Sequence, residues 1–210
     1  MYAGVDPSLT STGLVVLSNT GQVLEKRVVK PKKDLVGSTL GQVARLIYIE
    51  NEIIDTLVQL SGVNPVYIGY EHYSYGSINK PFKLGELGGV LKTSFYKWGW
   101  GQIHISPSVL KKFAVDDGHA SKDRVKEQAI MEANMASTMP DDIYDAYFLA
   151  KFAWYVQAPQ DVINYEVDEA RNLLRGRLEL ILDKFKFDFN LQNQELEEGE
   201  DDGEEESRSS

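Results

Sequence analysis

The stretch YAGVDPSLTSTGLVVL, residues 2–17, contains two apolar segments separated by a short polar one. Residues 2–6 and 12–17 each have the length and apolar content of a strand, and PSLTST between them supplies turn-forming residues. Asp6 stands at the end of the first segment, directly before the turn. The stretch therefore predicts a strand hairpin with a carboxylate at the end of one strand.

Alternating strand and helix patterns follow this hairpin. Further strands are expected at residues 23–29, 66–73 and 102–106. Amphipathic periodicity, caps and turn residues predict helices at residues 38–60, 82–97, 107–113, 122–135, 141–157 and 166–186. Antiparallel strands followed by alternating units indicate an α/β fold, in which helices flank a mixed five-stranded sheet.

The net charge of −10 is unevenly distributed over the 210 residues. Residues 195–210 hold nine acids and one Arg, whereas the rest of the chain holds 23 acids and 21 basic residues. Low complexity and self-repulsion predict a disordered acidic tail at 191–210, preceded by a helical extension at 158–190. Residues 1–157 are expected to form one domain with a core of ordinary size.

Composition excludes several classes of protein. The chain contains no Cys, so disulfides and thiolate metal sites are excluded. No apolar run reaches the length that crosses a membrane, and the N-terminus lacks the basic-then-apolar pattern of a secretion signal. We therefore expect a soluble, cytoplasmic protein with no membrane partner.

Residues 80–126 combine positive charge with aromatic side chains. This segment carries nine basic and four acidic residues, interleaved with Phe82, Phe95, Tyr96, Trp98 and Trp100. Lysines and aromatic rings together suit phosphate contact and base stacking. The pattern indicates a nucleic-acid partner, although solvated lysines around core aromatics would produce the same composition.

The stretch PDDIYDAYFLAK, residues 140–151, places three acids at the head of an apolar helix. Acids in a first helical turn cap the helix and favour its dipole, which is one sufficient explanation. Asp145 fits it poorly, because it lies further along the helix among apolar residues. Asp142 and Asp145 are three residues apart and share one helix face, where a cation between them would relieve their repulsion.

Two more carboxylates stand at predicted strand ends. Asp6 ends the first strand, and Glu71 lies near the end of the strand in VYIGYEHY, residues 66–73. Functional sites in open α/β sheets gather at strand ends, so these acids converge with Asp142 and Asp145 if their strands are neighbours. Four carboxylates are hard oxygen ligands that suit Mg²⁺ or Mn²⁺, and two such ions can clamp a phosphodiester.

These segments together resemble RuvC-type Holliday junction resolvases, a family of the ribonuclease H-like superfamily. GVDPSLTSTGLVVL is similar to that family's first strand motif, and DDIYDAYFLA to its closing acidic helix motif. Three further segments are similar to its middle motifs: VYIGYEHY, NKPFKLGELGGVL and SPSVLKKFAVDDGHASKDRVKE. The similar segments run in order over about residues 1–157.

The resemblance implies a homodimeric, Mg²⁺-dependent endonuclease that cuts four-way DNA junctions, with two ions per active site and Mn²⁺ able to substitute. It implies Asp6, Glu71, Asp142 and Asp145 as metal ligands and Lys122 beside the scissile phosphate. It also implies a dimer interface at the helix of residues 82–97. The residues expected to contact DNA are Tyr73, Tyr75, Lys80, Lys83, Lys111, Lys112, Lys122 and Arg124.

Some features depart from the family pattern. Asp141 is a spare acid where the family has small residues, and the acidic tail lies outside the compact bacterial pattern. Viral members cut branched DNA more broadly, so a bacteriophage member working in host cytoplasm fits these departures. Two other readings stay open: an ATPase of the actin and sugar-kinase superfamily, suggested by DPSLTSTG, and a branched-DNA-binding module without activity.

Overall fold

The computed structural model describes residues 1–32, 39–62, 64–71 and 81–157. The predicted extension at 158–190 and the predicted tail at 191–210 therefore lie outside the described residues. The same holds for Tyr73, Tyr75 and Lys80, and for the side chain of Lys83. No helix of the described part is long and apolar enough to cross a membrane.

Five strands form one mixed sheet in the order β3-β2-β1-β4-β5. The strands are β1 (Tyr2–Asp6), β2 (Thr12–Leu17), β3 (Val23–Val29), β4 (Tyr67–Glu71) and β5 (Gly101–Ile105). The β1–β2 and β2–β3 pairs are antiparallel, whereas β1–β4 and β4–β5 are parallel. This arrangement confirms the predicted α/β fold with a mixed five-stranded sheet.

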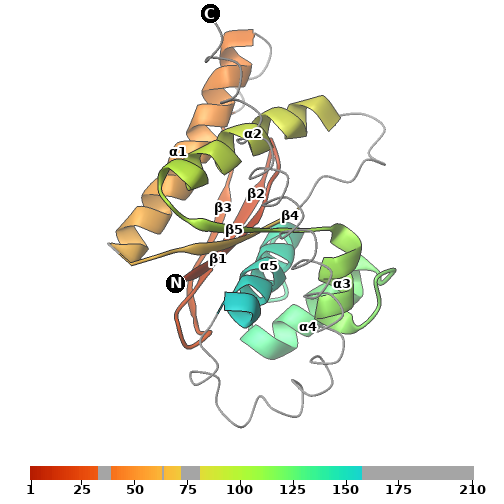
Figure 1. Ribbon diagram of the computed structural model, residues 1–210. Coiled ribbons are helices and arrows are strands. Elements are labelled where there is room, and N and C mark those ends of the chain that lie inside the picture. Colours follow the sequence, from red (N-terminus) through yellow and green to blue (C-terminus); the bar gives the residue numbers. More distant parts are fainter. Residues whose placement is uncertain (33–38, 63, 72–80, 158–210) are drawn as a thin grey trace, which may run out of the picture. The chain divides into compact units, whose positions relative to one another are not determined.

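Helices cover both faces of the sheet (Figure 1). Helices α1 and α2 lie on one face, and α5, accompanied by α3 and α4, lies on the other. The helices are α1 (Thr39–Ser61), α2 (Pro81–Lys97), α3 (Pro107–Val115), α4 (Lys122–Ala133) and α5 (Asp141–Gln157). Each corresponds to a predicted helix, but α4 ends at Ala133 because Asn134 adopts the left-handed conformation, with φ of 48°.

The face of the sheet toward α1 and α2 carries the larger apolar core. Val5, Leu14 and Ile68 on the strands are fully buried against Ile53 of α1 and Leu87 of α2. Alternation along the strands turns Ala3, Val16 and Tyr70 toward the same side. Hydrophobic burial on this face therefore holds the sheet and the two helices together.

Glycines on the other face let α5 lie directly on the sheet. A Cβ atom on Gly4 of β1 would stand 1.9 Å from the Ala146 carbonyl oxygen. Equivalent atoms on Gly13 of β2 and Gly69 of β4 would stand 2.0 Å and 2.1 Å from helix carbonyl oxygens. Three neighbouring strands thus present bare backbone to one helix, and this contact sets the depth and position of α5.

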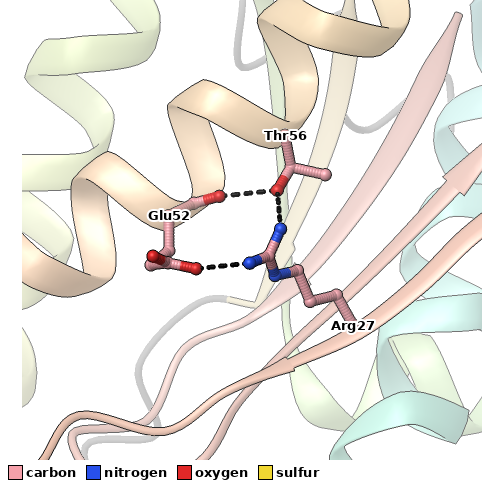
Figure 2. A network of polar contacts seen from close by, with 3 residues as sticks. All are labelled: Arg27, Glu52 and Thr56. Atoms are coloured by element: carbon pink, nitrogen blue, oxygen red, sulfur yellow. Dashed lines mark hydrogen bonds and ion pairs between the residues drawn. The ribbon is translucent and has the colours of Figure 1, made fainter.

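A polar contact ties the edge strand β3 to α1 (Figure 2). Arg27 donates to the hydroxyl of Thr56 at 2.9 Å and to the carboxylate of Glu52 at 2.6 Å. The Thr56 hydroxyl in turn donates to the Glu52 carbonyl at 2.7 Å, so it is satisfied in both directions. Thr56 is buried, whereas Arg27 is exposed enough to reach water.

Replacing Thr56 with Val keeps its shape and removes the hydroxyl. We expect the free energy of unfolding to fall by about 1 kcal/mol, because Arg27 loses one buried acceptor. Urea unfolding followed by circular dichroism measures the change. Lys26→Met, an exposed change on the same strand, is the control, and equal unfolding midpoints for Thr56→Val and wild type would rule out a stabilising role for this contact.

Candidate active site

The parallel register of β1 and β4 brings Asp6 and Glu71 side by side. Val5 pairs with Tyr70, so the next position on each strand is an acid. Both acids lie two residues after a glycine that faces α5, so both point to that side of the sheet. A side-chain hydrogen bond joins Asp6 and Glu71.

The start of α5 brings Asp142 and Asp145 to the same place. The backbone of Asp142 lies against Gly13 of β2, and Ala146 lies against Gly4 of β1. Asp142 and Asp145 are half-buried, whereas the spare Asp141 is exposed. The contact between α5 and the glycines therefore places one face of the helix, with two of its three acids, next to the strand ends.

The acids of this cluster interact electrostatically. Burial raises the pKa of Asp6 well above its ordinary value, and the hydrogen bond and charge of Glu71 and the charges of Asp145 and Asp142 act in the same direction. Burial, followed by the charge of Glu71, raises the pKa of Asp145 to about 6. Four carboxylates therefore lie within mutual influence at one edge of the sheet, which is where the sequence predicts them to converge.

Lys122 is the basic residue that the structure brings to these acids. It is the first residue of α4, which Ser121 caps by accepting from the Arg124 amide. Its positive charge lowers the pKa of Asp145 and so opposes the raising effect of burial there. The structure therefore places Lys122 close enough to the cluster to act on Asp145.

The other basic residues predicted to contact DNA lie on α3 and α4. Lys111 is half-buried and Lys112 is exposed on α3. Arg124 is exposed on α4 and forms a salt bridge with Asp117 at 3.3 Å. Arg124 would have to share or leave this partner to contact a phosphate, whereas the structure gives Lys112 no such competitor among the described residues.

The donor set of the cluster suits a hard divalent cation. All four side chains offer carboxylate oxygens, which Mg²⁺ and Mn²⁺ prefer, and their crowded charges need neutralising. As they stand, no three or more His, Cys, Asp or Glu side chains of the described residues enclose a point where a cation would fit. Asp6 and Glu71 instead interact directly with each other, and a bound cation would neutralise their crowded charges.

One residue of the site, Ser11, could not be predicted from the sequence. Ser11 belongs to PSLTST, where the pattern predicts only a turn. In the structure its hydroxyl donates to Oδ2 of Asp142 at 2.5 Å, across 131 positions of sequence. No local signal links residues so far apart, so only the packing of α5 on the sheet reveals this contact.

Comparisons with known proteins are informative at the level of structure. No protein-family model matches the chain, and no curated protein matches it. The solved structure of Thermus thermophilus RuvC matches with a TM-score of 0.59 and 21% sequence identity, covering 74% of this chain and 94% of that chain. The chain has a RuvC-like fold.

A second RuvC structure agrees with the first. Thermus thermophilus RuvC in complex with Holliday junction substrate matches with a TM-score of 0.58 and 21% identity, covering 74% of this chain and 93% of that chain. The expected ribonuclease H-like architecture is therefore confirmed as a RuvC-like fold. The match spans nearly the whole length of both RuvC chains, so the likeness concerns a complete domain.

The raised pKa of Asp145 predicts how stability depends on pH in the absence of divalent metal. The folded state holds this proton to about pH 6, whereas the unfolded chain releases it near the ordinary value of 3.8. Ionised Asp145 therefore destabilises the fold above pH 6, and stability is regained as pH falls through 6 toward 4. Asp6, whose pKa is also raised, acts in the same direction.

Asp145→Asn should remove the loss of stability that ionised Asp145 causes above pH 6. At pH 7.5 in EDTA we expect the melting temperature to rise by at least about 3 °C, because about 1 kcal/mol or more of repulsion and desolvation is lost. Differential scanning fluorimetry between pH 5 and 8 measures it. Asp141→Asn, an exposed change one turn away, should have a smaller effect, and a melting temperature for Asp145→Asn below wild type would contradict the electrostatic interpretation.

Proposed function

We propose that this protein is a Mg²⁺-dependent endonuclease that cuts phosphodiester bonds at four-way DNA junctions and related branched DNA. The observation that carries the proposal is the convergence of Asp6, Glu71, Asp142 and Asp145 at one edge of a RuvC-like sheet. A RuvC with this fold has been solved with a Holliday junction substrate, which supports branched DNA as the substrate class.

The four acids would hold two divalent cations. Asp6 ends β1, which lies between β2 and β4 and directly beneath α5, so we assign it to bridge both ions. Glu71 and Asp145 would each hold one ion, and Asp142 would complete the set. Two bound cations activate a water molecule and stabilise the leaving oxygen of a phosphodiester.

Lys122 would stabilise the negative charge that develops on the scissile phosphate. Its position beside Asp145, at the start of α4, supports this role. Lys111, Lys112 and Arg124 would contact the phosphate backbone from α3 and α4, where binding gains affinity without reading sequence. Tyr73, Tyr75 and Lys80 of the segment between β4 and α2 remain proposed DNA contacts, as does Lys83 at the start of α2.

The proposed enzyme is a homodimer that uses α2 at its interface. Gly85 and Gly89 lie one turn apart on α2, and a Cβ atom on either would meet nothing within 4 Å. An open pair of glycines on one helix face permits close approach of another helix. A two-fold dimer would place one active site on each of two opposite junction strands, which suits paired cleavage.

The test is cleavage of synthetic DNA by purified protein in Mg²⁺ and in EDTA. A four-way junction, a three-way junction, a fork and a linear duplex of the same sequence are compared. We expect Mg²⁺-dependent paired nicks near the centre of the four-way junction. Equal cleavage of all branched substrates would indicate a general debranching nuclease instead of a junction resolvase. Junction binding without cleavage would indicate an inactive DNA-binding module. If the protein neither binds nor cleaves these substrates but hydrolyses ATP, the ATPase hypothesis would be favoured.

A further inference from the structure

We infer that Ser11 is a positioning residue for Asp142, and that its hydroxyl selects which carboxylate oxygen of Asp142 meets a divalent cation. The inference rests on the proposed function and deepens it, because it concerns a residue outside the four acids. Its basis is the hydrogen bond from Ser11 Oγ to Asp142 Oδ2 at 2.5 Å. A hydroxyl that donates to one carboxylate oxygen fixes how the carboxylate is turned.

The turn between β1 and β2 holds Ser11 in place. Ser8 Oγ accepts from the backbone amides of Thr10 and Ser11 at 3.3 Å each. Thr12 Oγ1 accepts from the Ser8 amide at 3.1 Å and donates to the Ser8 carbonyl at 2.6 Å. Thr12 is fully buried at the start of β2, so the turn is anchored in the core. The hydroxyl of Ser11 is thus presented by a rigid backbone.

The backbone of Asp142 is held independently of its side chain. The Asp142 carbonyl would stand 2.0 Å from a Cβ atom on Gly13, which is the second residue after Ser11. Ser11 and Gly13 are separated by one residue, and both contact Asp142 in the first turn of α5. Ser11 contacts its carboxylate, and Gly13 contacts its backbone. Gly13 therefore sets where the Asp142 backbone lies, and Ser11 sets how its carboxylate is turned.

The hydrogen bond distinguishes the two oxygens of Asp142. Oδ2 is engaged by Ser11, whereas Oδ1 has no hydrogen bond within the described part of the chain. Asp142 would therefore bind a cation through Oδ1, while Oδ2 keeps its hydrogen bond with Ser11. Partners that orient a metal-binding side chain typically change metal affinity 10- to 100-fold when they are removed.

The experiment compares Mn²⁺ binding to the full-length protein without DNA, by electron paramagnetic resonance titration. For Ser11→Ala we expect a dissociation constant raised by about 10-fold, with the melting temperature in EDTA within about 2 °C of wild type. Ser11→Thr, which keeps the hydroxyl, should bind within about threefold of wild type. Thr10→Ala removes a hydroxyl from the same turn without touching Asp142, and its affinity should be unchanged. Junction affinity in EDTA should be equal in all four proteins.

Four results would overturn the inference. Wild-type Mn²⁺ affinity in Ser11→Ala would show that the hydroxyl does not orient Asp142. Equal losses in Ser11→Ala and Thr10→Ala would assign the effect to the turn as a whole. If Ser11→Ala does not fold, Ser11→Gly replaces it, and wild-type affinity in that variant would have the same meaning. Wild-type protein that binds no Mn²⁺ would remove the proposed metal centre itself, a result distinct from the first three.

Discussion

Asp6→Asn is expected to reduce junction cleavage by at least about 1,000-fold, equivalent to about 4 kcal/mol of transition-state stabilisation. Asp6 is the acid proposed to bridge both ions, and it ends β1, between the strands and beneath the helix that carry the other three acids, so both proposed ions depend on it. Asn has nearly the same shape but no negative charge, so it cannot neutralise two cations. The fold itself should gain stability, because the change removes a carboxylate whose pKa is raised by burial and by its acidic neighbours.

Single-turnover cleavage of a four-way junction in Mg²⁺ measures the rate, and gel-shift titration in EDTA measures junction binding. Asp6→Asn should bind the junction as tightly as wild type. Asp55→Asn is the matched control, because Asp55 is exposed on α1, which covers the opposite face of the sheet. Wild-type cleavage by Asp6→Asn would show that the metal-ligand assignment is wrong. Loss of junction binding in that variant would instead assign Asp6 to DNA contact.

Gly4→Ala should severely destabilise the fold, with a loss of about 3 kcal/mol or more in the free energy of unfolding. The new Cβ would stand 1.9 Å from the Ala146 carbonyl oxygen and 2.3 Å from the Ala150 amide nitrogen. Both atoms belong to the backbone of α5, so no side-chain rotation can relieve the contact. Helix α5 would have to move off the sheet and carry Asp142 and Asp145 away from Asp6.

Urea unfolding and soluble yield at 37 °C measure this effect. Asn51→Ala is the control, because Asn51 is exposed on α1, away from the contact between α5 and the sheet. Ala has a higher helix propensity than Asn, by up to about 0.7 kcal/mol, so this control should equal or exceed wild type in stability. A Gly4→Ala protein as stable as wild type would mean that α5 does not rest on the β1 backbone.

Strand and helix order could be predicted from local patterns, because each element has its own periodicity and its own turn residues. Sheet register could not, since it depends on contacts between distant segments. The pairing of Val5 with Tyr70 aligns Asp6 with Glu71, and nothing in either strand alone specifies that alignment. The three glycines that admit α5 lie in three different strands, so their common role emerges only once the strands are adjacent.

The choice between Asp141 and Asp142 illustrates the same limit in the site. Both are acids at the start of α5, and helix capping alone favours neither strongly. Packing on the sheet distinguishes the two acids, because Asp142 lies against Gly13 whereas Asp141 is exposed. Ser11 became visible as a partner of Asp142 only through this same packing, because 131 positions separate the two residues.

The most direct test of the central proposal is a crystal structure of the protein with Mn²⁺, using anomalous scattering to locate the ions. The proposal predicts anomalous peaks in contact with carboxylate oxygens of Asp6, Glu71, Asp142 and Asp145. Oδ1 of Asp142 should face an ion while Oδ2 remains on Ser11. Crystals that contain Mn²⁺ at other sites and show no peak among these four acids would contradict the proposed metal centre.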